Sequence, residues 1–221
     1  MRIRFFSASI LLLAASFQAG CETVPPSDGA RQGPFFTPTN TRGVERLPAA
    51  IRRVALLPAA GGPGVVEESL VRMDEALLAE FTRTARAECV PVSRELLARI
   101  AGVRQIDSAA ALPHDLLTRI KSATQADAVV FVDITSYSPY PPLAIGLRAK
   151  LVNVESSDIL WAFDAIFDSA KPAVRNSARR HALAEGNTFT MTADMSATIL
   201  QNPSRFAAYV GAATFATLPP R

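Results

Sequence analysis

Apolar residues recur along this chain with two different periods, which predicts both helices and strands. Between residues 66 and 86 they fall three or four positions apart, as on one face of a helix: Val66, Leu70, Met73, Leu77, Phe81 and Ala85. Shorter helices are expected at 93–102, which Ser93 is placed to cap, and at 113–125, which opens on Pro113. Two more are expected at 172–186 and 202–218.

Strands are predicted where apolar residues run continuously or alternate with polar ones. Residues 51–59 and 126–137 are apolar runs typical of strands that are covered on both faces, and 89–92 forms a shorter one. Residues 144–154 and 159–169 alternate instead and flank the turn sequence ESSD, so they predict a hairpin with one wet face.

The hairpin pattern assigns a face to each side chain. Ile145, Leu147, Ala149 and Leu151 share one side of the first strand, and Trp161, Phe163, Ala165 and Phe167 share one side of the second. Arg148 and Lys150, and opposite them Asp164 and Asp168, are assigned to the wet face, where they can pair. The order of elements predicts an α/β fold in which helices pack on a mixed β-sheet.

The first twenty residues have the layout of an export signal. Two arginines precede an apolar core, and Ala19 and Gly20 stand directly before Cys21. Small residues followed by cysteine resemble the lipobox of bacterial lipoproteins, which implies cleavage before Cys21 and attachment of lipid, including palmitate, to its thiol. Gln18 departs from the aliphatic residue usual in that motif. By the same resemblance, Glu22 favours the periplasmic face of the outer membrane.

Residues 21–50 are expected to be the lipidated cysteine and a flexible tether. The stretch 22–50 holds five prolines and three glycines with no sustained period. As a flexible chain it has a root-mean-square span of about 30 Å. These features divide the chain into a signal peptide at 1–20, the tether, and a single α/β domain with C-terminal helices at 51–221, which we expect to fold without the tether.

Charge and composition bear on only one class of partner, nucleic acid. The net charge is +3 over 221 residues, and it falls to +1 without Arg2 and Arg4. Such a weak balance gives no reason to expect nucleic-acid binding.

No pattern predicts a catalytic residue, a cofactor or a metal site. The glycine-rich stretch 61–64 lacks the lysine of a phosphate-binding loop, and Glu67 and Glu68 disfavour an anion there, so we interpret it as a turn. His114 and His181 are far apart and are expected at the surface or at helix ends. Cys89 is expected to be a small apolar core residue.

One loop stands out as a candidate partner-binding surface. Residues 136–146 are rich in proline and carry two tyrosines, a residue type favoured in protein contacts. The candidate residues are Tyr137, Tyr140, Pro141 and Pro142. The alternative, a purely structural connection, stays open.

Three segments resemble a group of envelope proteins. RVALLPA, ADAVVFVDI and above all AKLVNVESSDILWA resemble the domain shared by the curli-secretion-channel lipoprotein, the lipoprotein activators of penicillin-binding proteins and the amino-terminal domain of TolB. The resemblance covers residues 51–170 and implies an anticodon-binding-domain-like sandwich. The chain departs from the pattern of this group at two places. Ser156 and Ser157 stand where the group often has Thr-Gly in the turn, and Asp133 lies near a position where the group often has glycine.

The function expected from these features is that of a non-catalytic, lipid-anchored module that binds another envelope protein. The membrane is reached through Cys21, and the partner protein is unidentified. Two alternatives remain open: an oligomeric outer-membrane lipoprotein of the secretion-channel type, and a periplasmic hydrolase whose site is not visible in the sequence.

Overall fold

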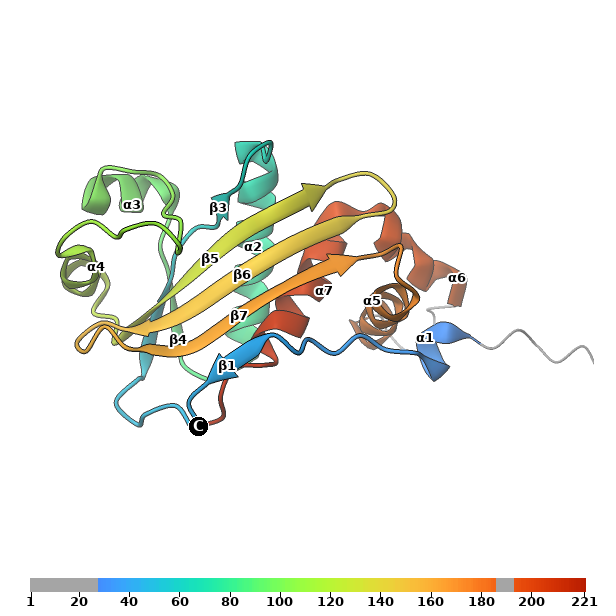
Figure 1. The fold of residues 1–221 in the computed structure, drawn as a ribbon, viewed down its shortest axis with the longest axis horizontal. Helices are drawn as coiled ribbons and strands as arrows, with labels where there is room; N and C mark the ends of the chain where they lie inside the picture. Colours follow the sequence, from blue (N-terminus) through green and yellow to red (C-terminus); the bar gives the residue numbers. More distant parts are fainter. Residues whose placement is uncertain (1–27, 186–192) are drawn as a thin grey trace, which may run out of the picture.

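A single mixed sheet organises the part of the chain that the computed structural model describes, residues 28–185 and 193–221 (Figure 1). Neighbouring strands follow the order β1, β7, β6, β5, β2 and β4, and β3 pairs with β5. The strands are β1 Thr41–Gly43, β2 Arg53–Leu56, β3 Ala60–Gly61, β4 Glu88–Pro91, β5 Ala128–Ser138, β6 Ala144–Asn153 and β7 Ile159–Asp168.

The sheet is parallel at one side and antiparallel at the other. β2 runs parallel to both β4 and β5, and β3 is also parallel to β5. β5, β6 and β7 form an antiparallel meander, and β1 pairs antiparallel with β7. The predicted mixed sheet and the predicted hairpin are therefore confirmed.

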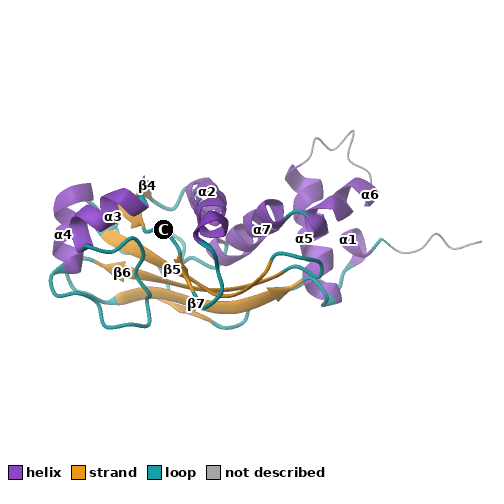
Figure 2. Cartoon of the chain, turned by 90° about the horizontal axis from the view of Figure 1, so that it is seen from above, coloured by secondary structure: helices purple, strands orange, loops and turns teal. Residues whose placement is uncertain are grey.

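Helices gather above the sheet and at its two ends. Seen from above, α2 and α7 lie over the middle strands, α3 and α4 lie at one end, and α1, α5 and α6 lie at the other (Figure 2). The helices are α1 Gly29–Gln32, α2 Glu67–Arg83, α3 Arg94–Ala101, α4 Leu116–Thr124, α5 Pro172–Glu185, α6 Ala193–Ser196, the 3-10 helix η1 Ala197–Gln201, and α7 Pro203–Phe215.

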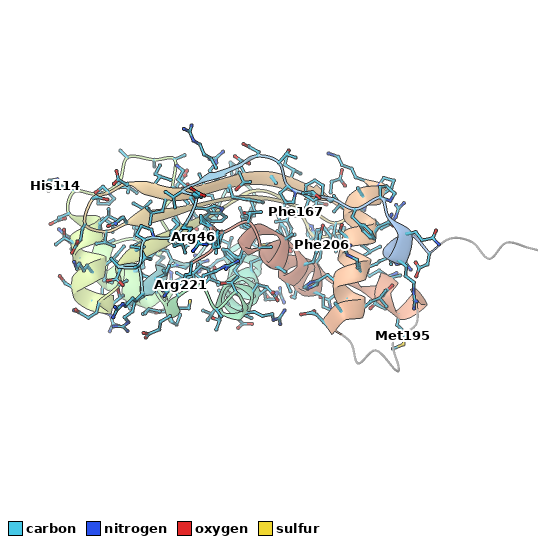
Figure 3. The ribbon with its side chains drawn as sticks, turned by 90° about the horizontal axis from the view of Figure 1, so that it is seen from below. Arg46, His114, Phe167, Met195, Phe206 and Arg221 are labelled. Carbon is cyan, nitrogen blue, oxygen red and sulfur yellow. The ribbon has the colours of Figure 1, made fainter. Side chains whose placement is uncertain are left out.

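The larger hydrophobic cluster lies between the sheet and helices α2, α5 and α7. The strand residues assigned to one face by alternation enter it or, as Ala165 does, pack against it, and Leu70, Met73, Leu77 and Phe81 of the predicted helical stripe meet them. Val66, which was predicted to belong to that stripe, is 62% exposed. A row of aromatic side chains crosses this layer. In this row Tyr209 contacts both Phe167 and Phe206 at ring-centroid distances of 5.7 Å (the two phenylalanines are labelled in Figure 3). Buried members of the cluster include Leu70, Met73, Leu77, Phe81, Val130, Val132, Leu147, Leu151, Trp161 and Phe163.

A smaller cluster on the opposite face of β5 and β2 packs against α3 and α4. Val129 and Phe131 alternate with the β5 residues of the larger cluster and meet Leu97 and Ile120 from the two helices. Ser93 caps α3 as predicted, because its hydroxyl accepts a hydrogen bond from the Leu96 amide at 3.1 Å. Both faces of β5 are thus buried from Ala128 to Ile134, as the apolar run predicted, whereas Thr135 and Ser136 of the same strand are exposed.

Several helix boundaries differ from the prediction, and α7, which was expected to run to residue 218, ends at Phe215. α4 begins at Leu116 rather than at Pro113, because Asp115 adopts a left-handed conformation with φ 59°. α2 ends at Arg83, and Ala85, predicted to belong to it, has φ 52°. A left-handed residue cannot continue a right-handed helix, so each of these positions sets a boundary that the apolar spacing alone does not reveal.

The tether interpretation is wrong for residues 28–50, which pack along the domain and are called here the strap. β1 extends the sheet by pairing with β7. Phe36 lies edge-on against Phe167 at 5.2 Å, and Leu47 is buried. Proline and glycine are common in flexible tethers, but here they shape an irregular chain whose apolar residues find the core.

Polar contacts fix both ends of the strap. Asp28 pairs with Arg179 of α5 at 3.0 Å, and the Phe36 amide donates to the Ser177 hydroxyl at 2.9 Å. At the other end the Leu47 amide donates to the Pro220 carbonyl at 2.9 Å, and Arg46 to the Arg221 carbonyl at 3.4 Å (Figure 3). The strap therefore belongs to the folded unit, whose boundary is residue 28 or earlier rather than residue 51.

Within the described residues, no helix combines the length and the apolar composition needed to cross a lipid bilayer.

Candidate functional site

The loop between β5 and β6 presents an aromatic side chain to solvent. Tyr140 has an exposed fraction of 78%, and Pro141 and Pro142, joined by a cis peptide bond, are exposed beside it. Leu143 anchors the end of the loop, since it is buried in the larger cluster and its carbonyl accepts a hydrogen bond from the Ser169 amide at 2.9 Å. The loop therefore offers apolar area on a fixed base.

Tyr137 does not share this surface. It is half-buried and packs against the larger cluster, opposite Ile145 in the β5–β6 register. The structure thus brings together Tyr140, Pro141 and Pro142 of the predicted set and places Tyr137 beneath them. That these residues bind a partner stays a prediction.

A polar sheet face adjoins the loop along β6 and β7. Arg148 and Asp164 form the predicted cross-strand pair, with Nε and Oδ2 3.0 Å apart. Such a partly exposed pair contributes only about 0 to 1 kcal/mol to stability. Ile166 lies on the same face with an exposed fraction of 55%. This face adds a mixed polar and apolar surface to that of Tyr140.

A buried acid, Asp133, lies near the centre of β5. Its carboxylate accepts hydrogen bonds from the amide and the hydroxyl of Ser108, and Lys150 donates to the Ser108 carbonyl at 2.6 Å. Burial raises the pKa of the Asp133 carboxyl. Because the amide and the hydroxyl of Ser108 both donate to this carboxylate and its carbonyl accepts from Lys150, Ser108 is held in place on the sheet.

This contact was not predicted from the sequence, although one signal for it was present. Asp133 is the only charged residue between Ala128 and Ser138, and a lone acid in an apolar strand requires a partner when it is buried. The partner comes from the loop before α4, 25 residues away, which no local pattern identifies. The contact fixes that loop to the sheet.

A hollow of about 530 Å³ lies between this loop and the end of the sheet. It contains two carboxylates, those of Asp115 and Glu155. Both are exposed and ion-paired, with Arg119 at 3.1 Å and with Lys121 at 2.6 Å respectively. In this part of the structure, the two carboxylates of the hollow are thus held in ion pairs with side chains of α4.

Other sequence candidates have structural roles. The Gly62 amide donates to the Ile134 carbonyl at 2.9 Å and the Gly61 amide to the Gln105 side chain at 3.2 Å, so neither amide is free to hold a phosphate. Cys89 is half-buried against the larger cluster, and burial raises the pKa of its thiol, which disfavours the nucleophilic thiolate. Cys21 lies outside the described residues.

Comparisons with solved structures return bacterial proteins of low similarity, one of them described as a lipoprotein. Lipoprotein GNA1162 from Neisseria meningitidis is 17% identical over 52% of this chain and 79% of its own, with a TM-score of 0.35. The PelC dodecamer from Paraburkholderia phytofirmans is 12% identical over 75% of this chain and 96% of its own, with a TM-score of 0.39. The LpoB C-terminal domain from Salmonella enterica is 12% identical over 53% and 83%, with a TM-score of 0.38.

No protein-family model and no curated protein matches the sequence. With identities of 12–17% and TM-scores of 0.35 to 0.39, the structural matches carry no argument about the family or function of this chain.

Proposed function

We propose that this chain is a non-catalytic, lipid-anchored envelope protein that binds another envelope protein through the β5–β6 loop. The observation that carries the proposal is the 78% exposure of Tyr140 on a loop with an anchored base. A large aromatic side chain held in water costs solvation free energy, and burying it against a partner recovers that cost with little loss of side-chain entropy.

Anchoring is proposed at Cys21, on the periplasmic face of the outer membrane. The folded strap changes what this anchor implies, because only residues 22–27 separate Cys21 from Asp28. Seven successive Cα–Cα steps span at most about 25 Å. The end of the domain formed by α1 and α5 is therefore held close to the bilayer, and the Tyr140 loop works near the membrane rather than at the reach of a long tether.

A photo-crosslinking amino acid at position 140 tests the binding proposal. In native envelopes, we expect it to yield a discrete adduct with a second protein, while the same amino acid at Ile159, which is 56% exposed on β7, yields none. Adducts with the mass of two or more copies of this chain would favour the oligomeric alternative. Absence of any adduct from position 140, or equal adducts from both positions, would contradict the proposed surface.

The substitution Tyr140→Ala separates binding from folding. Because the side chain is exposed, its removal should change the free energy of unfolding by no more than about 0.5 kcal/mol. The yield of a crosslink placed at Pro141 should fall in the same variant. If the melting temperature falls along with the crosslink yield, Tyr140 supports the fold. If the crosslink yield is unchanged, Tyr140 does not contact the partner.

A further inference from the structure

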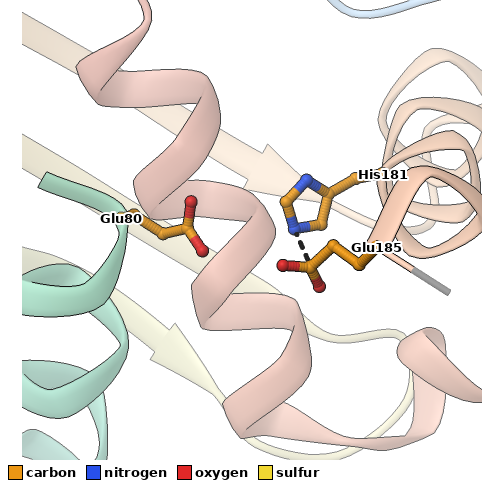
Figure 4. A group of neighbouring side chains, drawn as sticks. All are labelled: Glu80, His181 and Glu185. Carbon is orange, nitrogen blue, oxygen red and sulfur yellow. Dashed lines mark ion pairs between the residues drawn. The ribbon is translucent and has the colours of Figure 1, made fainter. Parts of the chain in front are cut away.

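Three side chains that can bind a metal ion converge between α2, α5 and α7. Glu80 comes from α2, and His181 and Glu185 come from α5, four positions apart and so on one face of that helix (Figure 4). One ligand atom of each lies within 4.8 Å of those of the other two. His181 was expected at the surface or at a helix end, whereas its side chain is only 15% exposed.

Glu80 is a buried carboxylate aimed into this group. Its exposed fraction is 3%, and burial raises the pKa of its carboxyl. It passes close to α7 where Gly211 has no side chain, since a Cβ atom there would lie 3.2 Å from the Glu80 Cβ and Cγ. Packing of α2 on α7 thus delivers the carboxylate to the helix that bears His181.

The imidazole of His181 places a buried ring nitrogen in this group. Its Nε2 is buried and makes no hydrogen bond, although it lies 3.4 Å from Glu185 Oε2. A neutral imidazole is the form of histidine that binds metal ions. Tyr209 also contacts the ring, but burial raises the pKa of its hydroxyl to about 12, so it stays protonated.

Arg83 only partly neutralises the two carboxylates. Its Nη1 donates to both Glu80 oxygens, at 2.8 and 3.0 Å, and to Glu185 Oε1 at 2.8 Å. Two carboxylates thus share one guanidinium, and the Arg205 cation also acts on His181. The Arg83 side chain is 58% exposed and can turn into solvent if another cation takes its place.

We propose that Glu80, His181 and Glu185 form a binding site for a divalent metal ion of the zinc type. One imidazole nitrogen and two carboxylate oxygens suit Zn²⁺, whereas Mg²⁺ prefers oxygen ligands alone and retains water. At ordinary Zn–N and Zn–O distances of about 2.1 Å, tetrahedral ligand atoms lie about 3.4 Å apart, so small side-chain rotations close the group.

The site has a route to solvent and a structural effect. His181 lines a hollow of about 460 Å³ together with Ser177, Arg180 and Tyr209, through which an ion and its fourth ligand, a water molecule, can arrive. Because Glu80 and the other two ligands belong to different helices, a bound ion links α2 to α5. Binding to the folded state alone raises the melting temperature by mass action.

Zinc titration of the full chain, purified in detergent and freed of metal, tests the proposal. We expect one equivalent of Zn²⁺ to bind by calorimetry and to raise the melting temperature, and the same concentration of Mg²⁺ to leave it unchanged. His181→Gln should weaken zinc binding at least about tenfold, as expected for loss of a ligand. The matched control His114→Gln changes an exposed histidine and should bind zinc as the unmodified chain does.

A second variant keeps the test decisive if His181→Gln folds poorly. Arg83→Met leaves all three ligands and removes the competing cation, so the metal-free protein should melt at a lower temperature while its shift with zinc becomes larger. If the three residues form only an ion-pair network, the variant should melt at a lower temperature, but zinc should not raise its melting temperature by a larger amount. Failure of the unmodified chain to bind zinc, or equal binding by the His181→Gln variant, would overturn the proposal.

Discussion

Replacing Trp161 by alanine is expected to lower the free energy of unfolding by about 3 to 5 kcal/mol, through lost burial and the cavity left behind. The side chain is 1% exposed in the larger cluster. It stacks on Phe163 with a centroid distance of 6.0 Å and contacts Phe215 of α7 at 6.4 Å. Its indole N–H also donates to the Thr217 hydroxyl at 3.1 Å, a partner that the substitution leaves without its donor.

Chemical denaturation of both proteins measures this effect, and Ile159→Ala is the matched control. Ile159 lies on the same strand but is 56% exposed, so its replacement should change the free energy of unfolding by no more than about 0.5 kcal/mol. Equal stability of the Trp161→Ala variant and the unmodified protein would mean that the face assigned to β7 is inverted.

Removing the strap is expected to lower the free energy of unfolding by about 5 kcal/mol or more. This loss is comparable to the whole stability of a typical domain. A chain that starts at Ala50 lacks β1, which leaves β7 with an unpaired edge. It also lacks Phe36, which covers the buried Phe167, and Leu47. Such a chain should show a broad thermal transition and bind a dye specific for exposed apolar surface.

A chain that starts at Asp28 is the control for the strap experiment. It keeps the pairing of β1 with β7 and the ion pair between Asp28 and Arg179, so it should melt in one sharp transition at the temperature of the longer chain. A sharp, unchanged melt of the chain that starts at Ala50 would contradict the structural role assigned to the strap.

The sheet and its larger cluster could be predicted because their signals are local and repeated. The alternation of apolar and polar residues in β6 and β7 is enough, without any knowledge of tertiary contacts, to assign Leu147, Arg148 and Trp161 to the faces on which they lie. The stripe of α2 did the same for Met73 and Phe81, since a period of 3.6 residues identifies the buried side of a helix without reference to its partners.

The strap could not be predicted, because its order depends on residues far away in the sequence. Residues 22–50 have the proline and glycine content of a flexible chain. What holds the described part is a set of single contacts, such as the one between Phe36 and Ser177, which are 141 residues apart. Composition reports the absence of regular structure and cannot distinguish a loose chain from an irregular one that is packed.

The charged groups were missed for a related reason. The spacing of His181 and Glu185 on a predicted helix was visible and could have identified two potential ligands on one face. Glu80 could not be added to them, because it reaches the group only through the packing of α2 against α7 at Gly211. Sequence patterns locate the members of such a cluster on their own elements, and tertiary packing decides which elements meet.

The most direct test of the proposed anchored function is the state of Cys21 in native envelopes. Mass spectrometry should find an amino-terminal peptide that begins at Cys21 and carries a diacylglycerol. The lipidated protein should sediment with outer membranes in high salt, and the Cys21→Ser variant should be released, since no described helix can span the bilayer. An unlipidated Cys21, or a serine variant that still sediments with membranes in high salt, would contradict the account.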